Sequence, residues 1–200
     1  DIVIQKREND LVLATFGRGF YILDDYTPLR FLTSDTLNQD AVVFPVKSAW
    51  MFEEYGRLGG RDKGSQGEMY FTADNPPFGA TITYYLREGI QTLKEKREQE
   101  EEEAVKNKQP VYYPSYDQIT AEEEEETPFL MFTILDEEGY VVRRLREAVK
   151  AGLNRLTWDL RYPAVDPTST RDISPTSSGP SSTFVLPGKY TVYLSKNVNG

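Results

Sequence analysis

The sequence predicts a mainly β protein built around an antiparallel β-sandwich. Three runs in residues 128–194 carry bulky side chains at every second position, and each is bounded by a turn that contains glycine or proline. This period of two is typical of strands with one buried face. The runs are 129–135, 152–161 and 186–194, and the side chains predicted to be buried are Leu130, Phe132, Ile134, Leu156, Trp158, Leu160, Tyr190, Val192 and Leu194.

The first 25 residues are predicted to form two or three further strands. Residues 11–15 and 20–23 are apolar runs separated by Gly17 and Gly19, which can adopt the positive φ that a tight hairpin needs. Residues 1–5 already have the composition of a strand and lack the charged and apolar regions of a signal peptide. A lone hairpin is marginally stable in water, so we expect this one to pack on other structure.

Residues 27–86 are predicted to contain short elements and a linker. Thr27 and Pro28 favour a short helix through residue 32, and Ser34 favours a second turn through residue 37. Residues 41–44, 68–72 and 80–86 are predicted strands. Residues 47–67 carry five glycines, and we interpret them as a linker anchored by the aromatic residues Trp50, Phe52 and Tyr55.

Residues 88–127 are predicted to be a charged helical insertion. They hold 13 acidic against 5 basic residues and few apolar side chains. We expect a solvated helix over 91–108, a loop over 110–116 and a short helix over 121–126. Because sandwich strands are predicted on both sides, the segment is an insertion into the sandwich rather than a domain boundary. Residues 163–183, rich in Pro, Ser and Thr, are predicted to be a long loop.

Composition excludes several function classes. The chain has no cysteine and no histidine, which removes disulfides and almost every zinc, copper or haem site. No cofactor is predicted. The formal charge of −9 argues against nucleic acid as a partner. No apolar run approaches the roughly 20 residues that a bilayer requires, so no membrane span is expected.

Two features near the N-terminus suggest chemistry but have a stronger structural interpretation. Asp24 and Asp25 are adjacent carboxylates, and paired carboxylates can hydrolyse glycosides. Neighbours on a strand point to opposite faces, so we favour a turn or cap before Thr27. Arg18 lies between Gly17 and Gly19, and one arginine alone favours hairpin geometry over a carboxylate-binding site. No catalytic, cofactor-binding or metal-binding residue is therefore predicted.

Three further groups of residues have both a functional and a structural interpretation. One group of aromatic residues, named at the end of this paragraph, could form a platform on which a sugar stacks, but we favour the interpretation that these residues pin the linker and the insertion onto the sandwich. The glutamate runs 100–103 and 122–126 do not fit a spaced Ca²⁺ loop and favour solvated helix faces. Trp158 is expected to fill the core while Asp159 ties down the loop that follows. The aromatic group comprises Trp50, Tyr112, Tyr113 and Tyr116.

Several spaced motifs resemble known bacterial proteins. The C-terminal motifs resemble the Ig-like domain at the end of flagellar hook-capping proteins and of many secreted bacterial proteins. The N-terminal motifs resemble the C-terminal part of sialidase-like, sortilin-like β-propeller proteins, often labelled as BNR-repeat glycosyl hydrolases. The first set is Thr133-Ile-Leu-Asp136, Gly139, Val142-Arg143, Ala151-Gly-Leu-Asn154, Trp158-Asp159 and Pro187-Gly-Lys-Tyr190; the second is residues 10–25, Pro28-Leu-Arg30, Phe44-Pro45 and residues 73–80.

The resemblance implies a domain organisation. Residues 1–30 would be the end of a propeller blade, 31–66 a linker, and 67–200 an Ig-like β-sandwich with the insertion at 88–127. The Asp-box that marks such blades does not occur in this chain. Phe16 stands where the family usually has a histidine, so the role of that histidine does not carry over.

The resemblance also implies a function. The chain would be a non-catalytic C-terminal accessory module, structural or interacting, of an exported sialidase-like propeller protein, secreted, periplasmic or on the cell surface. Its partners would be the upstream propeller of the same protein and carbohydrate or another protein. The alternative is a part of a glycoside hydrolase that contributes to a carbohydrate site at the junction between propeller and sandwich. The enzyme question stays open for the parent protein.

Overall fold

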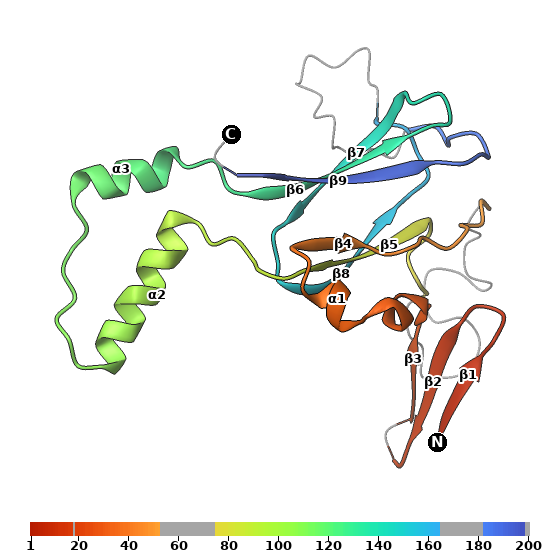
Figure 1. Cartoon of the computed structure of the whole chain (residues 1–200), viewed down its shortest axis with the longest axis horizontal. Helices are drawn as coiled ribbons and strands as arrows, with labels where there is room; N and C mark the ends of the chain where they lie inside the picture. The colour runs from red at the N-terminus through yellow and green to blue at the C-terminus, as the bar shows by residue number, and fades with distance from the viewer. Residues whose placement is uncertain (18, 53–74, 165–181, 199–200) are drawn as a thin grey trace, which may run out of the picture.

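A computed structural model describes residues 1–17, 19–52, 75–164 and 182–198 of the 200-residue chain (Figure 1). These residues form three antiparallel sheets of three strands each, which confirms the mainly β class. The N-terminal sheet has the order β1-β2-β3, and the other two sheets have the orders β4-β5-β8 and β7-β6-β9. The strands are β1 (Ile2–Gln5), β2 (Asp10–Thr15), β3 (Gly19–Leu23), β4 (Ala41–Val43), β5 (Ala80–Leu86), β6 (Phe129–Leu135), β7 (Val141–Ala148), β8 (Gly152–Trp158) and β9 (Thr191–Asn197).

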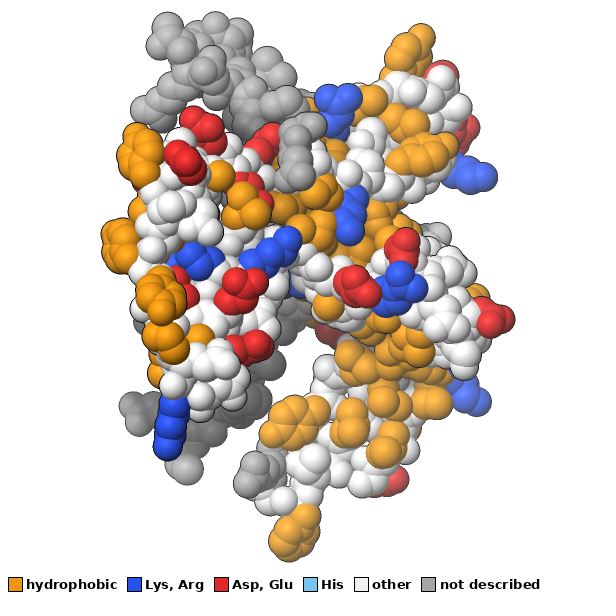
Figure 2. Space-filling view, turned by 60° about the vertical axis from the view of Figure 1, so that its left-hand side comes forward, with side chains coloured by type: hydrophobic (Ala, Val, Ile, Leu, Met, Phe, Trp, Pro, Cys, Tyr) orange, Lys and Arg blue, Asp and Glu red, His pale blue; other side chains and the backbone are white. Residues whose placement is uncertain are grey.

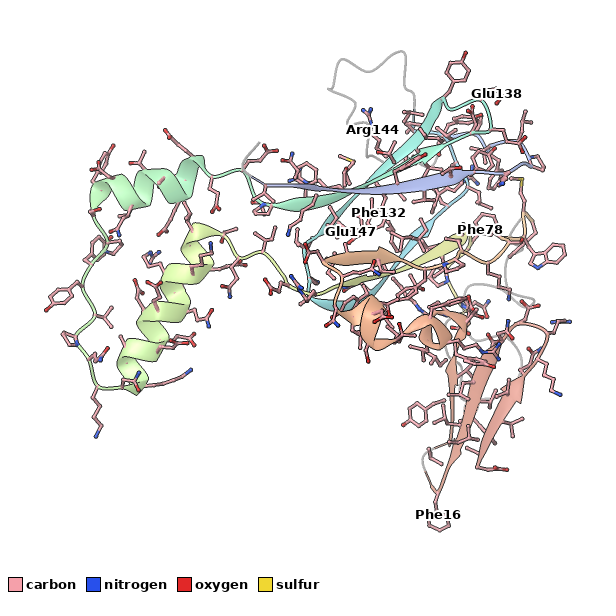
Figure 3. All side chains as sticks on the ribbon, viewed as in Figure 1. Phe16, Phe78, Phe132, Glu138, Arg144 and Glu147 are labelled. Atoms are coloured by element: carbon pink, nitrogen blue, oxygen red, sulfur yellow. The ribbon has the colours of Figure 1, made fainter. Side chains whose placement is uncertain are left out.

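The sheets β4-β5-β8 and β7-β6-β9 pack face to face and form a two-sheet core (Figure 1). Leu130, Phe132 and Ile134 on β6 are completely buried. The rings of Tyr84 on β5 and Phe132 lie with their centroids 4.9 Å apart, and Figure 3 places Phe132 between the two sheets. All nine side chains predicted to be buried belong to the two apolar clusters of this core. The prediction is confirmed for five of them, and the other four, Leu156, Tyr190, Val192 and Leu194, are partly buried against the clusters.

Trp158 joins the core to the chain that follows it. Its indole packs edge-on against Tyr190 with 5.1 Å between ring centroids, and its Nε1 donates a hydrogen bond to the carbonyl of Arg161 at 3.1 Å. The Asp159 carboxylate accepts from the Arg161 backbone at 3.2 Å, as predicted for a residue that ties down this loop. A Cβ on Gly79 would meet the Trp158 carbonyl at 1.9 Å, so only glycine fits beside the end of β8.

Strand β7 is an element that the sequence analysis missed. It pairs with β6 so that Arg143 stands opposite Ile134 and Glu147 opposite Leu130, with a register shift between Ile134 and Leu135. Residues opposite each other share one face of a sheet, so both charged residues lie on the face that carries the core. Figure 3 shows Glu147 between the sheets. This interruption of the apolar pattern is why the strand was not recognised.

Strand β9 starts later than predicted. The expected run began at residue 186, whereas β9 covers Thr191–Asn197. Pro187 and Gly188 form a bend before the strand. The Tyr190 hydroxyl donates a hydrogen bond across this bend to the carbonyl of Leu186 at 2.5 Å. Proline cannot donate to a strand ladder, which accounts for the later start.

The short helices form where expected but begin differently. The 3₁₀ helix η1 (Thr27–Phe31) has Tyr26, not Thr27, at its N-cap, and the α1 helix (Ser34–Leu37) is capped by Thr33, not Ser34. Thr33 and Thr36 exchange side-chain and backbone hydrogen bonds in a capping box. The two predicted capping residues are therefore wrong by one position each.

The insertion contains two helices, α2 (Leu93–Lys106) and α3 (Tyr116–Glu124). Helix α2 matches its prediction, and Thr92 and Glu95 form its capping box. Helix α3 was predicted over 121–126 and instead begins five residues earlier, because Ser115 and Gln118 form a second capping box. Figure 1 shows the two helices projecting from the two-sheet core as a helical arm, residues 88–127.

Some predictions fall outside the described residues. These are the strand over 68–72, most of the linker over 47–67 including Tyr55, most of the loop over 163–183, and Arg18. Among the helices that the structure describes, none has the length and apolar character needed to cross a bilayer.

Arg143 is a cation in the apolar core. Its side chain is 1% exposed, and none of its three guanidinium nitrogens has a hydrogen-bond partner among the described residues. Glu147 lies four residues further along the same extended strand, about 13 Å away along the backbone, which is too far for an ion pair. Burying a charge without a partner is unfavourable because its hydration is lost and nothing replaces it.

We predict that Arg143→Met stabilises the protein. Methionine has a similar length and no charge to desolvate, so the free energy of unfolding should rise by on the order of 1 to 4 kcal/mol. Urea denaturation followed by circular dichroism measures this. Arg144→Met is the matched control: Arg144 is the exposed neighbour on β7, and its replacement should change stability by less than about 0.5 kcal/mol. A loss of stability in Arg143→Met would show that the guanidinium has an anionic partner in solution.

Candidate functional site

The N-terminal sheet has apolar side chains on both of its faces. In the register of the three strands, Leu13 on β2 lies between Ile2 and Tyr21, and Val12 lies between Val3 and Ile22. Neighbours along a strand point to opposite faces, so these two rows cover the two sides of one sheet. The first face carries Ile2, Ile4, Leu11, Leu13, Tyr21 and Leu23, and the second carries Val3, Val12, Ala14, Phe20 and Ile22.

Both faces are open to solvent in this chain. Ile2 on one face is 64% exposed, and Phe20 and Ile22 on the other are 74% and 61% exposed. Figure 2 shows hydrophobic side chains gathered over the lower part of the molecule, where Figure 1 places the N-terminal sheet. Sheets that are apolar on both faces are normally covered on both faces. Large exposed apolar patches mark interaction sites, so this sheet is the main candidate interaction surface of the chain.

Among the described residues, polar contacts from Lys47 and Arg155 attach the N-terminal sheet to the rest of the chain. The Lys47 ammonium group pairs with the Glu8 carboxylate, and Arg155 on β8 donates to the carbonyl of Asp25 at 2.8 Å. The hydrogen bond from Lys47 holds the pKa of Glu8 below its usual value. Polar contacts at one end therefore join the sheet to the two-sheet core, and the outer strands of its two apolar faces are exposed in the described part of the chain.

Of the adjacent carboxylates Asp24 and Asp25, Asp25 is hydrogen-bonded to the backbone. The Asp25 carboxylate accepts from the backbone N–H of Thr27 at 3.1 Å, and the Asp25 N–H donates to the carboxylate of Asp10 at 2.9 Å. Asp25 itself has φ of +43°, which places it in the left-handed region that turns use. The predicted turn before the first helix is confirmed, and Asp25 is committed to it.

The four aromatic residues considered as a platform do not come together. Tyr112 and Tyr113 lie in the connector between α2 and α3, and Tyr116 begins α3, both in the helical arm (Figure 1), whereas Trp50 follows β4 in the chain. All four are exposed, the three tyrosines by 80%, 90% and 81%. The favoured alternative, that they pin the insertion onto the sandwich, is also wrong for the tyrosines, because side chains this exposed pack on nothing.

An arginine clamp holds the helical arm together. Arg97 on α2 donates from Nε and one terminal nitrogen to both oxygens of Glu122 on α3, at 2.6 and 2.9 Å. Its other terminal nitrogen donates to Glu101 at 2.7 Å. This bidentate contact lowers the pKa of Glu122 and raises that of Arg97. The arm is thus joined by charge more than by apolar packing, since neither helix has a buried residue.

The acidic runs do not form a metal site in the described part of the chain. No group of three or more carboxylates there is arranged to hold a metal ion. Lys94 pairs with Glu98 and Lys106 with Glu102 one turn apart, at 3.9 and 3.7 Å. These exposed pairs fit the solvated helix faces that the sequence predicts.

The two-sided apolar surface could have been recognised from the sequence. Residues 11–14 are continuously apolar rather than alternating, which is the pattern of a strand buried on both faces. This run was interpreted only as one strand of a hairpin.

No family model, curated protein or solved structure matches this chain.

The helical arm should be dispensable for folding. Its two ends are tied to each other at its base, where the Leu93 N–H donates to the Glu125 carboxylate at 2.7 Å. We predict that replacing residues 91–127 by a short Gly/Ser link leaves the two-sheet core folded. A shorter closed loop costs less entropy, so the stability should stay equal or rise by about 1 kcal/mol. Chemical denaturation compares the two proteins.

The control for this excision is a longer excision that removes one further residue, Ile90. Ile90 packs against the core cluster that contains Leu86 and Leu130, so an excision that also removes Ile90 should destabilise the protein. If the excision of 91–127 alone unfolds the chain, the arm contributes to the core and the prediction fails.

Proposed function

We propose that this chain is a non-catalytic C-terminal accessory module of an exported, sialidase-like propeller protein. In this proposal β1–β3 are strands at the end of a propeller blade, and β4–β9 are an Ig-like sandwich that follows the propeller. The module serves as a spacer, a stabiliser or an interaction surface. The spaced motifs in residues 10–25, 28–30 and 133–190 support this assignment.

The observation that carries the proposal is the pair of open apolar faces on the N-terminal sheet. A blade of a β-propeller is a small antiparallel sheet of four strands that packs between two neighbouring blades. Such a sheet must be apolar on both sides, whereas a sheet that faces water on one side alternates. The sheet of three strands in this chain is apolar on both sides, as a blade must be, because Val12 and Leu13 face opposite ways.

The alternative, a contribution to a glycoside hydrolase site at the junction, has weaker support. Retaining and inverting glycosidases need two carboxyl groups roughly 5 to 9.5 Å apart across the substrate. At the described junction Asp25 is committed to a turn and Glu8 to Lys47. These carboxylates already have structural partners.

An activity assay on the chain alone tests the non-catalytic role. We predict that the chain releases no sugar from a panel of aryl glycosides between pH 4 and 8. Release of sugar that disappears in Asp25→Asn would favour the hydrolase function instead. Asp35→Asn is the matched control, because Asp35 lies on the neighbouring helix α1, away from the junction contacts.

Hydrogen exchange tests the propeller assignment directly. In the chain alone, the amides of β1–β3 should exchange far faster than those of β6, since exposed small sheets open readily. In the parent protein that the proposal requires, the same amides should become protected, because blades cover both faces. Peptides from β6 serve as the internal control and should not change.

Two results would contradict the assignment. One is equal protection of β1–β3 in the chain and in the longer protein. The other is a gene that encodes no propeller blades before Asp1. Either result would leave the two apolar faces to a partner of another kind.

A further inference from the structure

The connector between α2 and α3 exposes large side chains to solvent. Tyr112, Tyr113 and Tyr116 are 80%, 90% and 81% exposed, and Val111 beside them is 44% exposed. Figure 1 places this connector on the side of the helical arm that faces away from the two-sheet core. Exposed apolar residues are ordinary when they are scattered singly, whereas four large side chains within six residues form a patch of the kind that marks an interaction site.

The patch borders a groove between the two helices of the arm. The groove has a volume of about 630 Å³ and is lined by residues of α2, of the connector and of α3. Val111, Tyr112 and Tyr113 line its connector side, and Ile119 and Glu123 line its α3 side. None of the lining residues is buried, so the whole groove offers surface to a partner.

The arm holds this surface in a fixed shape. Both helices begin with a capping box, and Arg97 joins α2 to Glu122 on α3. A surface that is ordered before binding loses less conformational freedom when a partner docks. Because the tyrosines are so exposed, they contribute little burial to the folding of the chain, and a role in binding explains their presence.

The charge of the arm determines which kind of partner is attracted. Residues 88–127 hold 13 acidic against 5 basic residues, and Lys94, Arg97 and Lys106 already pair with glutamates of the arm. Glu123 lines the groove and belongs to no ion pair among the described residues. Figure 2 turns the arm toward the viewer and shows acidic and hydrophobic side chains next to each other on its surface. The complementary partner is therefore cationic.

We propose that the aromatic edge of the arm, formed by Val111, Tyr112, Tyr113, Tyr116 and Glu123, docks an arginine-rich polypeptide segment of a partner protein. Guanidinium groups stack on tyrosine rings and pair with carboxylates, whereas a lysine ammonium group lacks the flat surface for stacking. Tyr116 and Glu123 are seven residues apart on α3, so a ring and a carboxylate lie on the same side of the helix. This surface is independent of the propeller assignment, because it belongs to the helical arm and not to the N-terminal sheet.

A neutral sugar fits the observations less well. Its rings would stack on the tyrosines, but it would make no use of the acidic excess of the arm. Binding of an uncharged ligand is insensitive to ionic strength, whereas contacts between exposed charges are screened by salt. The salt dependence of binding therefore separates the two classes of ligand.

Fluorescence anisotropy of a labelled peptide gives a direct test. A short peptide of alternating arginine and alanine should bind the full chain in a saturable manner at low salt. Raising the ionic strength from about 0.05 to about 0.5 M should weaken this binding at least 10-fold. The peptide of alternating lysine and alanine has the same charge and should bind at least 3-fold more weakly, because lysine does not stack on the tyrosine rings.

Replacement of the tyrosines tests the aromatic contact. The double variant Tyr112→Ser, Tyr113→Ser should weaken binding of the arginine peptide at least 10-fold. The matched control is the double variant Tyr140→Ser, Tyr193→Ser, because these tyrosines are 72% and 58% exposed and lie outside the arm. The control should bind as the unchanged chain does. Circular dichroism verifies that both variants fold, as expected for exposed positions.

A charge reversal tests the carboxylate. Glu123→Lys should weaken binding of the arginine peptide at least 5-fold. Glu138→Lys is the matched control, because it changes the net charge of the chain equally but lies in the turn between β6 and β7. This control should leave binding within 2-fold of that of the unchanged chain.

Three outcomes would overturn the proposal. The first is the absence of saturable binding of the arginine peptide at low salt. The second is unchanged binding by the Tyr112→Ser, Tyr113→Ser variant, or equal loss in Glu123→Lys and Glu138→Lys, since either would mean that the peptide responds only to the net charge of the chain. The third is binding that does not weaken with salt, which would assign the tyrosines to an uncharged ligand.

Discussion

The packing of β5 against β6 is the contact on which the two-sheet core depends. Each is the central strand of its sheet, so the remaining four strands of the core are positioned by pairing with one of them. Tyr84 meets Phe132 across this contact, and Leu86 and Leu130 belong to the same cluster. Burial raises the pKa of Tyr84, and nearby Glu147 raises it further. Because the chain passes from β5 to β6 through the helical arm, the arm begins and ends beside the central strands of the core.

The N-terminal sheet differs from the sheets of the two-sheet core in how its apolar side chains are distributed over its two faces. On β6 the buried side chains alternate with less buried ones, so each core sheet has one apolar face. On β2 every residue from Asp10 to Ala14 has the same intermediate exposure, and neither face is closed. Hydrophobic burial stabilises this sheet less than it stabilises the core. Among the described residues, Lys47 and Arg155 make polar contacts between this end of the chain and the rest. This contrast is the physical reason for proposing that the sheet is covered by another partner.

The sequence predicted the elements whose local pattern and tertiary role agree. Residues 80–86 and 129–135 alternate and form β5 and β6, and Trp158 lies in the core where the period of two placed it. Strand β7 was missed because Arg143 and Glu147 occupy positions that face the core, where the pattern calls for apolar residues. The start of α3 was missed because the Ser115 and Gln118 capping box was not recognised among the loop residues.

Two candidate sites show why spatial arrangement limits prediction from a sequence. A cleft at one edge of the two-sheet core is lined by residues from the segments 43–51, 80–82, 158–160 and 185–192. No local sequence pattern connects these four segments. The aromatic platform considered as an alternative is not formed for the same reason, since Trp50 follows β4 while the three tyrosines belong to the helical arm. The turn role of Asp25 could be predicted because its partner Thr27 is only two residues away.

The edges of the two-sheet core explain both the buried arginine and the position of the cleft. Edge strands tend to pair with other chains, and proteins prevent this with short edges, bulges, lysines and charged residues that point inward. Strand β7 has a register irregularity and the inward Arg143, β4 is three residues long, and β9 carries Lys196. A stability cost at Arg143 is consistent with such protection, because a charged residue at a core position disfavours pairing with a second copy. At the other edge the short β4 leaves the core open beside β9 without offering a template for a new strand.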